Sequence, residues 1–162
     1  MSNVSGDGIA KSSRGWTARH LEIYVQSGGV RGHILDLREV GGHRFTTTLL
    51  LRTIGRKSGT GRIVPLIYGN LGGEVAVIAS KGGAPAHPAW YLNLKEGEQA
   101  DFQIATEAFR AAWREPQGAE RQTIWEFMLG IYPRYNEYQG RTGREIPLIM
   151  LSALEPIDPF VA

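Results

Sequence analysis

Cysteine is absent from this chain of 162 residues. Without a thiol, the protein has no disulfide, no thiolate metal ligand and no cysteine nucleophile, which fits a reducing compartment. The four histidines show no spacing typical of metal ligands, so we expect no metal site; they are His20, His33, His43 and His87. No acidic pair and no serine in a nucleophile elbow is marked out for catalysis either.

Long apolar runs and a large net charge are also missing. No run approaches the roughly 20 residues of a membrane-spanning helix. Residues 1–16 are polar and lack the apolar core of a signal peptide. We therefore expect a disordered N-terminal segment over residues 1–16 of a cytoplasmic protein, and a single domain over residues 17–162. The net charge of +2 is too small to indicate a nucleic-acid partner.

Strand patterns dominate the rest of the chain. Apolar and β-branched runs predict six strands, over residues 46–54, 62–69, 74–80, 100–106, 108–115 and 144–154. Helical spacing predicts helices over residues 17–29 and 118–132. Residues 46–80 leave no room for helical crossovers, so we expect an antiparallel meander there, with Pro65 at an edge or bulge. The predicted fold is mainly β with flanking helices (α+β), built on a small six-stranded antiparallel barrel.

Two turns place cations beside glycines. The turn "GRKSGTGR", residues 55–62, combines flexible backbone amides with basic side chains, which together can bind an anion. The segment "ASKGGAPAHPAWYLNLK", residues 79–95, offers Lys81, two glycines and a helix start at Pro88, whose amides also favour an anion. Trp90 and Tyr91 add an aromatic wall. These features suit a flat phosphorylated ligand such as a flavin, although plain connecting turns and a core tryptophan remain the alternative.

Three tyrosines follow the second predicted helix. In "YPRYNEYQ", residues 132–139, Tyr132, Tyr135 and Tyr138 recur every three residues. Their rings could stack on an aromatic substrate and their hydroxyls could polarise its oxygens. From the spacing alone, a tyrosine-rich helix edge that closes the barrel is the favoured interpretation.

Three segments together resemble a known family. "LLLRTIGRKSGTGRIVPLIY", "VIASKGGAPAHPAWYLNL" and "IYPRYNEYQ" closely resemble the deazaflavin-dependent nitroreductase family, split-barrel flavin/deazaflavin oxidoreductases of actinobacteria. The resemblance covers residues 17–154. It implies a six-stranded antiparallel split β-barrel, similar to FMN-binding proteins. It also implies that coenzyme F-420, an 8-hydroxy-5-deazaflavin, is the cofactor, and that its reduced form delivers a hydride to a quinone, a nitroaromatic or an activated enone.

The resemblance also implies roles for individual residues. The implied cofactor-binding residues are Arg56, Lys57, Ser58, Arg62, Ile63, Val64, Pro65, Leu66, Ile78, Ala79, Ser80, Lys81, His87, Pro88, Ala89, Trp90 and Tyr91. Tyr132, Tyr135 and Tyr138, with Ser80, fall where the family binds and activates its substrate. For the tyrosines, this implication replaces the helix-edge interpretation.

Three alternatives accompany this hypothesis. The first keeps the barrel but replaces the deazaflavin with FMN or haem. The second is a non-catalytic carrier or storage protein for the deazaflavin. The third is peripheral association with the inner face of a membrane through the amphipathic segment 17–27, because quinones dissolve in membranes. The sequence predicts neither the physiological acceptor nor the oligomeric state.

Overall fold

The computed structural model describes residues 13–161. Its helices are α2 (Ser13–Gln26), α3 (Ala89–Gly97), α4 (Gly118–Ile131) and α5 (Tyr135–Gly140), with short 3-10 turns η1 (Arg38–Val40) and η2 (Lys81–Gly83). The disordered segment predicted for residues 1–16 falls largely outside the described residues, and the first helix begins at Ser13 rather than at residue 17.

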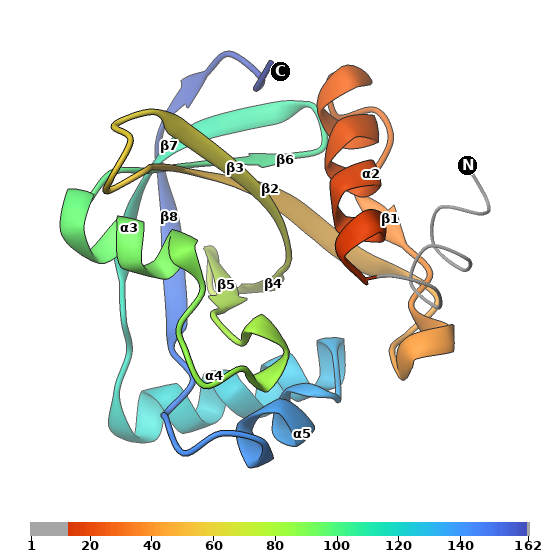
Figure 1. The fold of residues 1–162 in the computed structure, drawn as a ribbon, viewed down its shortest axis with the longest axis vertical. Coiled ribbons are helices and arrows are strands. Elements are labelled where there is room, and N and C mark those ends of the chain that lie inside the picture. The colour runs from red at the N-terminus through yellow and green to blue at the C-terminus, as the bar shows by residue number, and fades with distance from the viewer. Residues whose placement is uncertain (1–12, 162) are drawn as a thin grey trace.

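The strands form one curled antiparallel sheet, a half-barrel with flanking helices (Figure 1). They are β1 (Ile34–Leu35), β2 (Thr46–Ile54), β3 (Gly61–Ile67), β4 (Gly69–Leu71), β5 (Glu74–Ile78), β6 (Ala100–Ile104), β7 (Glu107–Arg114) and β8 (Leu148–Ile157). Their order is β1-β2-β6-β7-β8-β5-β4, and β3 pairs with β2 outside this path. Figure 1 shows α2 and α3 on opposite sides of the sheet, and α4 and α5 together at one end.

The predicted number of six strands is wrong, because the sheet has eight. The two additional strands are β1, which has two residues, and β4, which has three. Strands this short contain too few residues to show an alternation of apolar and polar side chains. The turn between β4 and β5 is Gly72–Gly73, where both residues have positive φ angles.

The predicted meander is correct at its first step and wrong at its second. β2 and β3 pair over their whole shared length, with Leu50 opposite Pro65. β3 lies at an edge of the sheet, as its proline predicted. However, the strand is interrupted at Tyr68, and β5 pairs with β4 and β8 instead of β3. The break lets the sheet curl, since β3 and β5 no longer have to lie in one flat ladder.

Three apolar clusters hold the helices to the sheet. The first joins α3 to the concave part of the sheet through residues such as Leu49, Leu51 and Trp90. The second lies under α4 and α5 and includes Ile78, Met128 and the three tyrosines. The third lies under α2. Because each helix has its own apolar contact with the sheet, the loops before α3 and α5 start from fixed positions.

The apolar face of α2 packs against the sheet. Leu21, Tyr24 and Val25 belong to the third cluster, together with Leu50 of β2. The Tyr24 hydroxyl donates a hydrogen bond to the Thr48 carbonyl at 2.9 Å. Packing therefore accounts for the amphipathic pattern of residues 17–27, and peripheral association with a membrane stays a prediction. Among the described residues, no helix has both the length and the apolar character that crossing a membrane requires.

A buried carboxylate joins β6 to its neighbours. Asp101 is 2% exposed, and its carboxylate accepts hydrogen bonds from Arg52 at 2.9 Å and from Arg110 at 3.3 Å. The Arg52 guanidinium also stacks over the Phe160 ring, 4.2 Å from its centroid. Asp101 thereby holds three strands and the C-terminal residues together at one point.

Replacing Asp101 with asparagine should lower the free energy of unfolding by about 2 kcal/mol, because two guanidinium groups would lose their shared charge partner. Urea denaturation measures this loss. The matched control is Glu155→Gln, which removes a largely exposed carboxylate 3.9 Å from the same Arg110 and should cost less than about 0.5 kcal/mol. Equal losses in the two variants would contradict the role assigned to the buried carboxylate.

Candidate functional site

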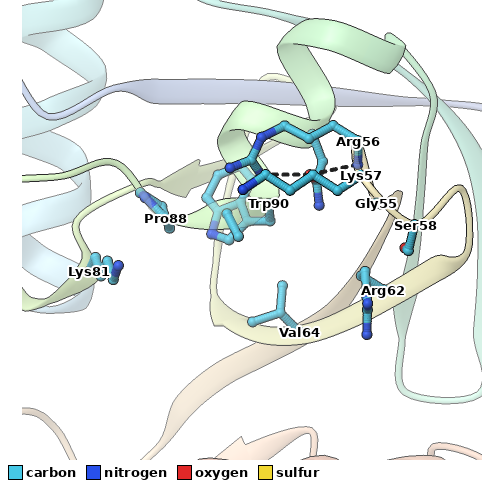
Figure 2. A pocket seen from close by; sticks show the side chains of 11 residues that line it. Gly55, Arg56, Lys57, Ser58, Arg62, Val64, Lys81, Pro88 and Trp90 are labelled. Carbon is cyan, nitrogen blue, oxygen red and sulfur yellow. Dashed lines mark hydrogen bonds between the residues drawn. The ribbon is translucent and has the colours of Figure 1, made fainter.

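A cavity of about 510 Å³ lies between the β2–β3 turn, β3 and the start of α3 (Figure 2). Its volume lies within the range of roughly 300–1,000 Å³ that is usual for small-molecule sites. The lining residues are Gly55, Arg56, Lys57, Ser58, Arg62, Val64, Lys81, Pro88, Ala89, Trp90 and Asn93. They come from both of the turns that the sequence analysis singled out, so the fold brings these two turns to one site.

The β2–β3 turn is closed by its own hydrogen bonds. The Gly55 amide donates to the Thr60 carbonyl, and the Gly59 amide donates to the Gly55 carbonyl, both at 2.8 Å. A Cβ atom at Gly55 would lie 2.5 Å from the Ser58 hydroxyl oxygen, so a side chain there would displace the Ser58 hydroxyl. The closed turn fixes the stretch that carries Arg56 and Lys57 next to α3.

Asn93 of α3 connects the helix to this turn. It is 4% exposed, and its Oδ1 atom accepts hydrogen bonds from both the Arg56 amide at 3.1 Å and the Arg56 Nη1 at 3.0 Å. Its Nδ2 atom donates to the Thr53 hydroxyl at 3.3 Å. One buried amide group therefore orients both the backbone and the guanidinium of Arg56.

Four cations surround the cavity: Arg56, Lys57, Arg62 and Lys81. None of them forms an ion pair with a carboxylate within the described part of the chain, whereas many other basic side chains do. Unneutralised cations around a concave surface attract anions strongly. Val64, Pro88, Ala89 and Trp90 supply an apolar wall beside them. The arrangement suits a ligand that is flat and apolar at one end and anionic at the other.

The η2 turn delivers Lys81 to the cavity in an unusual backbone conformation. Lys81, Gly82 and Gly83 have φ angles of 46°, 64° and 82°, all in the left-handed region. This region is unfavourable for a lysine, so surrounding contacts must hold the turn. On its far side, a Cβ atom at Gly83 would lie 2.6 Å from the Tyr138 carbonyl oxygen, which places the turn directly against α5.

Arg144 provides much of that support. All three of its guanidinium nitrogens donate to backbone carbonyls of the loop, to Ala84 at 2.9 Å, Ser80 at 2.8 Å and Ala79 at 3.3 Å. Its Nη1 atom also lies 3.0 Å from His87 Nδ1. Burial, and next the charge of Arg144, lower the pKa of His87.

The three tyrosines lie beyond the η2 turn, not in the cavity wall. The hydroxyls of Tyr132 and Tyr138 are 3.1 Å apart, and the rings of Tyr132 and Tyr135 meet edge to face with centroids 5.2 Å apart. Burial is the main cause that raises the pKa of Tyr132 well above its ordinary value. Its hydroxyl therefore stays protonated near neutral pH and can donate a hydrogen bond.

The structure separates the predicted site residues into two groups. The cavity is lined by Arg56, Lys57, Ser58, Arg62, Val64, Lys81, Pro88, Ala89 and Trp90. The remaining predicted residues lie beside or behind it: Ile63, Pro65 and Leu66 on β3, Ile78 at the end of β5, Ala79, Ser80 and His87 in the following loop, Tyr91 on α3, Tyr132 directly after α4, and Tyr135 and Tyr138 on α5. For this second group the functional roles stay predictions.

Sequence reasoning missed Gly55, Asn93 and Arg144. Asn93 follows Trp90 by three residues, so its place on the same helix face was a usable signal. Gly55 is the first residue of a turn that was already singled out. No local pattern indicates Arg144, because its hydrogen bonds reach 57 to 65 residues back along the chain.

Comparisons with known proteins identify the family of this chain. The model of the family described as F420H(2)-dependent quinone reductase matches residues 16–153. An F420H(2)-dependent quinone reductase of Mycobacterium tuberculosis is 30% identical over 146 residues, which are 85% of this chain and 95% of that protein. A solved structure of an F420-H2 dependent reductase (FDR-A) is 39% identical, with a TM-score of 0.60, over 65% of this chain and 93% of that chain.

A second solved structure, described as a domain-swapped dimer, is 34% identical with a TM-score of 0.62 and covers 87% of this chain and 100% of that chain. These similarities confirm the expected oxidoreductase family with coenzyme F-420 as its cofactor, so FMN is not needed as an alternative. The family model spans most of the chain, and this protein belongs to the F420H(2)-dependent quinone reductase family.

Proposed function

We propose that this protein transfers a hydride from reduced coenzyme F-420 to a quinone, and that the cavity beside α3 holds the cofactor. The observation that carries the proposal is a cavity with an apolar wall and four cations that have no carboxylate partner among the described residues. Coenzyme F-420 combines a flat conjugated ring system with a phosphate and an oligoglutamate tail. Its two ends therefore match the apolar and the cationic parts of the lining.

Each part of the lining has a distinct task in this proposal. Arg56, Lys57 and Arg62 hold the phosphate and the carboxylates of the tail through charge-assisted hydrogen bonds. Lys81 binds the phosphate region from the opposite turn. Trp90, with Val64 and Pro88, contacts the ring system and excludes water from it. When bound, the reduced deazaflavin supplies the hydride, and the protein supplies orientation and electrostatics.

The tyrosine cluster serves the acceptor in this proposal. During hydride transfer to a quinone, negative charge develops on a carbonyl oxygen, and a preorganised donor stabilises that charge. Tyr132 and Tyr138 share one hydrogen bond between their hydroxyls, which leaves one hydroxyl proton of the pair free to be such a donor, and Tyr135 packs against Tyr132. Ser80 lies between the two halves of the site, next to Lys81. Nitroaromatics and activated enones also develop negative charge on an oxygen, so we include them as candidate acceptors.

Titration of purified protein with oxidised coenzyme F-420, followed by fluorescence, tests the proposal, with FMN as the parallel ligand. We expect tighter binding of F-420 than of FMN. Lys81→Ala and Arg62→Ala should each weaken F-420 binding about tenfold or more, since each removes a charge-assisted bond. Arg44→Ala makes the same charge change outside the cavity lining and should have less than a twofold effect. A preference for FMN, or equal effects in all three variants, would contradict the assignment of the cavity.

Asn93→Ala should also weaken F-420 binding about tenfold, because it releases both the amide and the guanidinium of Arg56. The matched control is Gln103→Ala, which removes another fully buried amide that bonds the Ala105 carbonyl and the Phe160 amide. Thermal unfolding should report a loss of stability in both variants. The affinity for F-420 should fall only in Asn93→Ala. An equal fall of this affinity in Gln103→Ala would mean that Asn93 contributes only to the stability of the fold.

Tyr132→Phe and Tyr138→Phe should each lower the turnover of a quinone about tenfold while changing F-420 affinity less than twofold, because each removes a hydrogen-bond donor for the acceptor oxygen. Stopped-flow oxidation of bound reduced F-420 measures this step. Tyr24→Phe, which alters a buried hydroxyl under α2, is the control. Unchanged turnover in both variants would remove the tyrosines from the mechanism. Tight cofactor binding with no turnover on any acceptor would instead support the carrier alternative.

A further inference from the structure

The loop from Ala79 to His87 is folded around a single cation. The carbonyl oxygens of Ala79, Ser80 and Ala84 all point to the guanidinium of Arg144. Carbonyl groups that converge in this way lose water and repel one another unless a donor lies between them. Arg144 is that donor, and its planar group can bond several carbonyls at once, which a lysine ammonium cannot do with the same geometry.

Arg144 holds the loop, whereas a different part of the loop meets the cavity. Lys81 and Pro88 line the cavity, and Arg144 does not. Arg144 forms no ion pair with any carboxylate among the described residues, and burial lowers its pKa. Its charge is thus compensated by loop carbonyls, and all three nitrogens are already engaged. These contacts are typical of a residue that fixes the conformation of the loop without lining the cavity.

We propose that Arg144 is a positioning residue, whose hydrogen bonds to residues 79–87 hold Lys81 and Pro88 in the conformation that binds the cofactor. The left-handed backbone of Lys81, Gly82 and Gly83 has to be maintained by contacts outside the turn itself. The Arg144 bonds flank these three residues on both sides. The inference rests on the proposed function, because coenzyme F-420 is the ligand that the cavity is taken to bind.

The bond to His87 makes this positioning sensitive to pH. At 3.0 Å from Arg144 Nη1, His87 Nδ1 has to accept the hydrogen bond and so has to be unprotonated. The other groups that face His87 are the ring of Tyr91, at a centroid distance of 4.9 Å, and the charges of Glu115 and Lys95. Protonation of His87 would place a donor and a second positive charge against the guanidinium.

The direction of the pH effect follows from the lowered pKa of His87. The folded loop favours the neutral ring, so its stabilising contribution is complete above the ordinary value of 6.5 and declines as the pH falls below that value. When the pH is lowered, the affinity for the cofactor should therefore fall further in the wild type than in a variant in which His87 is replaced by a side chain that cannot be protonated.

The experiment compares Arg144→Lys with Arg38→Lys, an exposed arginine that bonds Asp36. Hydrogen exchange of residues 79–88 in the ligand-free protein measures the loop, and fluorescence titration measures F-420 affinity. In Arg144→Lys we expect faster exchange in this segment and about tenfold weaker F-420 binding. Arg38→Lys should match the wild type within twofold in both. Unchanged exchange and unchanged affinity in Arg144→Lys would overturn the proposal.

His87→Asn supplies a second, independent test, because the asparagine oxygen can accept near the position of Nδ1 and does not titrate. For each protein the measured quantity is the ratio of its own F-420 affinities at about pH 7.5 and pH 5.5, so an effect of the substitution that does not depend on pH cancels. Between about pH 7.5 and pH 5.5 the wild type should lose about threefold more affinity than the variant. Identical pH profiles would overturn the assigned role of His87, and this comparison decides the proposal if Arg144→Lys does not fold.

The two hypotheses fail in different ways. If the wild type does not bind F-420, the proposed function is wrong, whereas the exchange measurement on the ligand-free protein still reports whether Arg144 holds the loop. If the wild type binds F-420 but neither Arg144→Lys nor His87→Asn changes the loop or the affinity profile, the positioning role alone is wrong.

Discussion

The pairing of β2 with three other strands is the constraint on which the rest of this structure depends. β2 pairs with β1 at its start and with β3 and β6 along its length. Leu49, Leu50 and Leu51 are fully buried, because adjacent residues of this strand face two different apolar clusters. A strand that is buried on both faces cannot shift its register without a loss of stability, because its apolar side chains would leave their clusters. The turn that follows β2, with its two cations, therefore starts from a fixed point beside α3.

In the proposed function, the site divides into a cofactor side and an acceptor side that share one loop. The cavity with its unpaired cations lies on one side of the η2 turn, and α5 with its tyrosines lies on the other. This arrangement agrees with family membership, since a hydride donor and its acceptor have to meet while each keeps its own binding groups. In the proposed function, the cofactor carries the reaction and the protein supplies charge and shape around it, which agrees with the lack of a recognisable acid–base dyad among the described residues.

Much of this could be predicted from the sequence, and the failures share a physical cause. Strands long enough to alternate, the helix start at Pro88 and the two cationic turns follow from local rules, and the structure has them. The strands β1 and β4 were not among the six predicted strands, because two or three residues carry no periodic signal. The break at Tyr68 and the Arg144 contacts were missed because they depend on residues far apart in the chain, which only the folded sheet brings together.

The contact between Gly83 and the Tyr138 carbonyl has a consequence for how such an enzyme can change its substrate. At this contact there is no room for even a methyl group. The backbone of α5 and the backbone of the loop that carries Lys81 therefore cannot shift independently of each other. If the acceptor binds beside α5, as the proposed function has it, a mutation that shifts the helix to admit a bulkier acceptor would also disturb Lys81. New acceptor preferences are therefore most accessible through side-chain replacements that leave both backbones in place. Evolution at this site is then confined to exchanging side chains on an unchanged backbone.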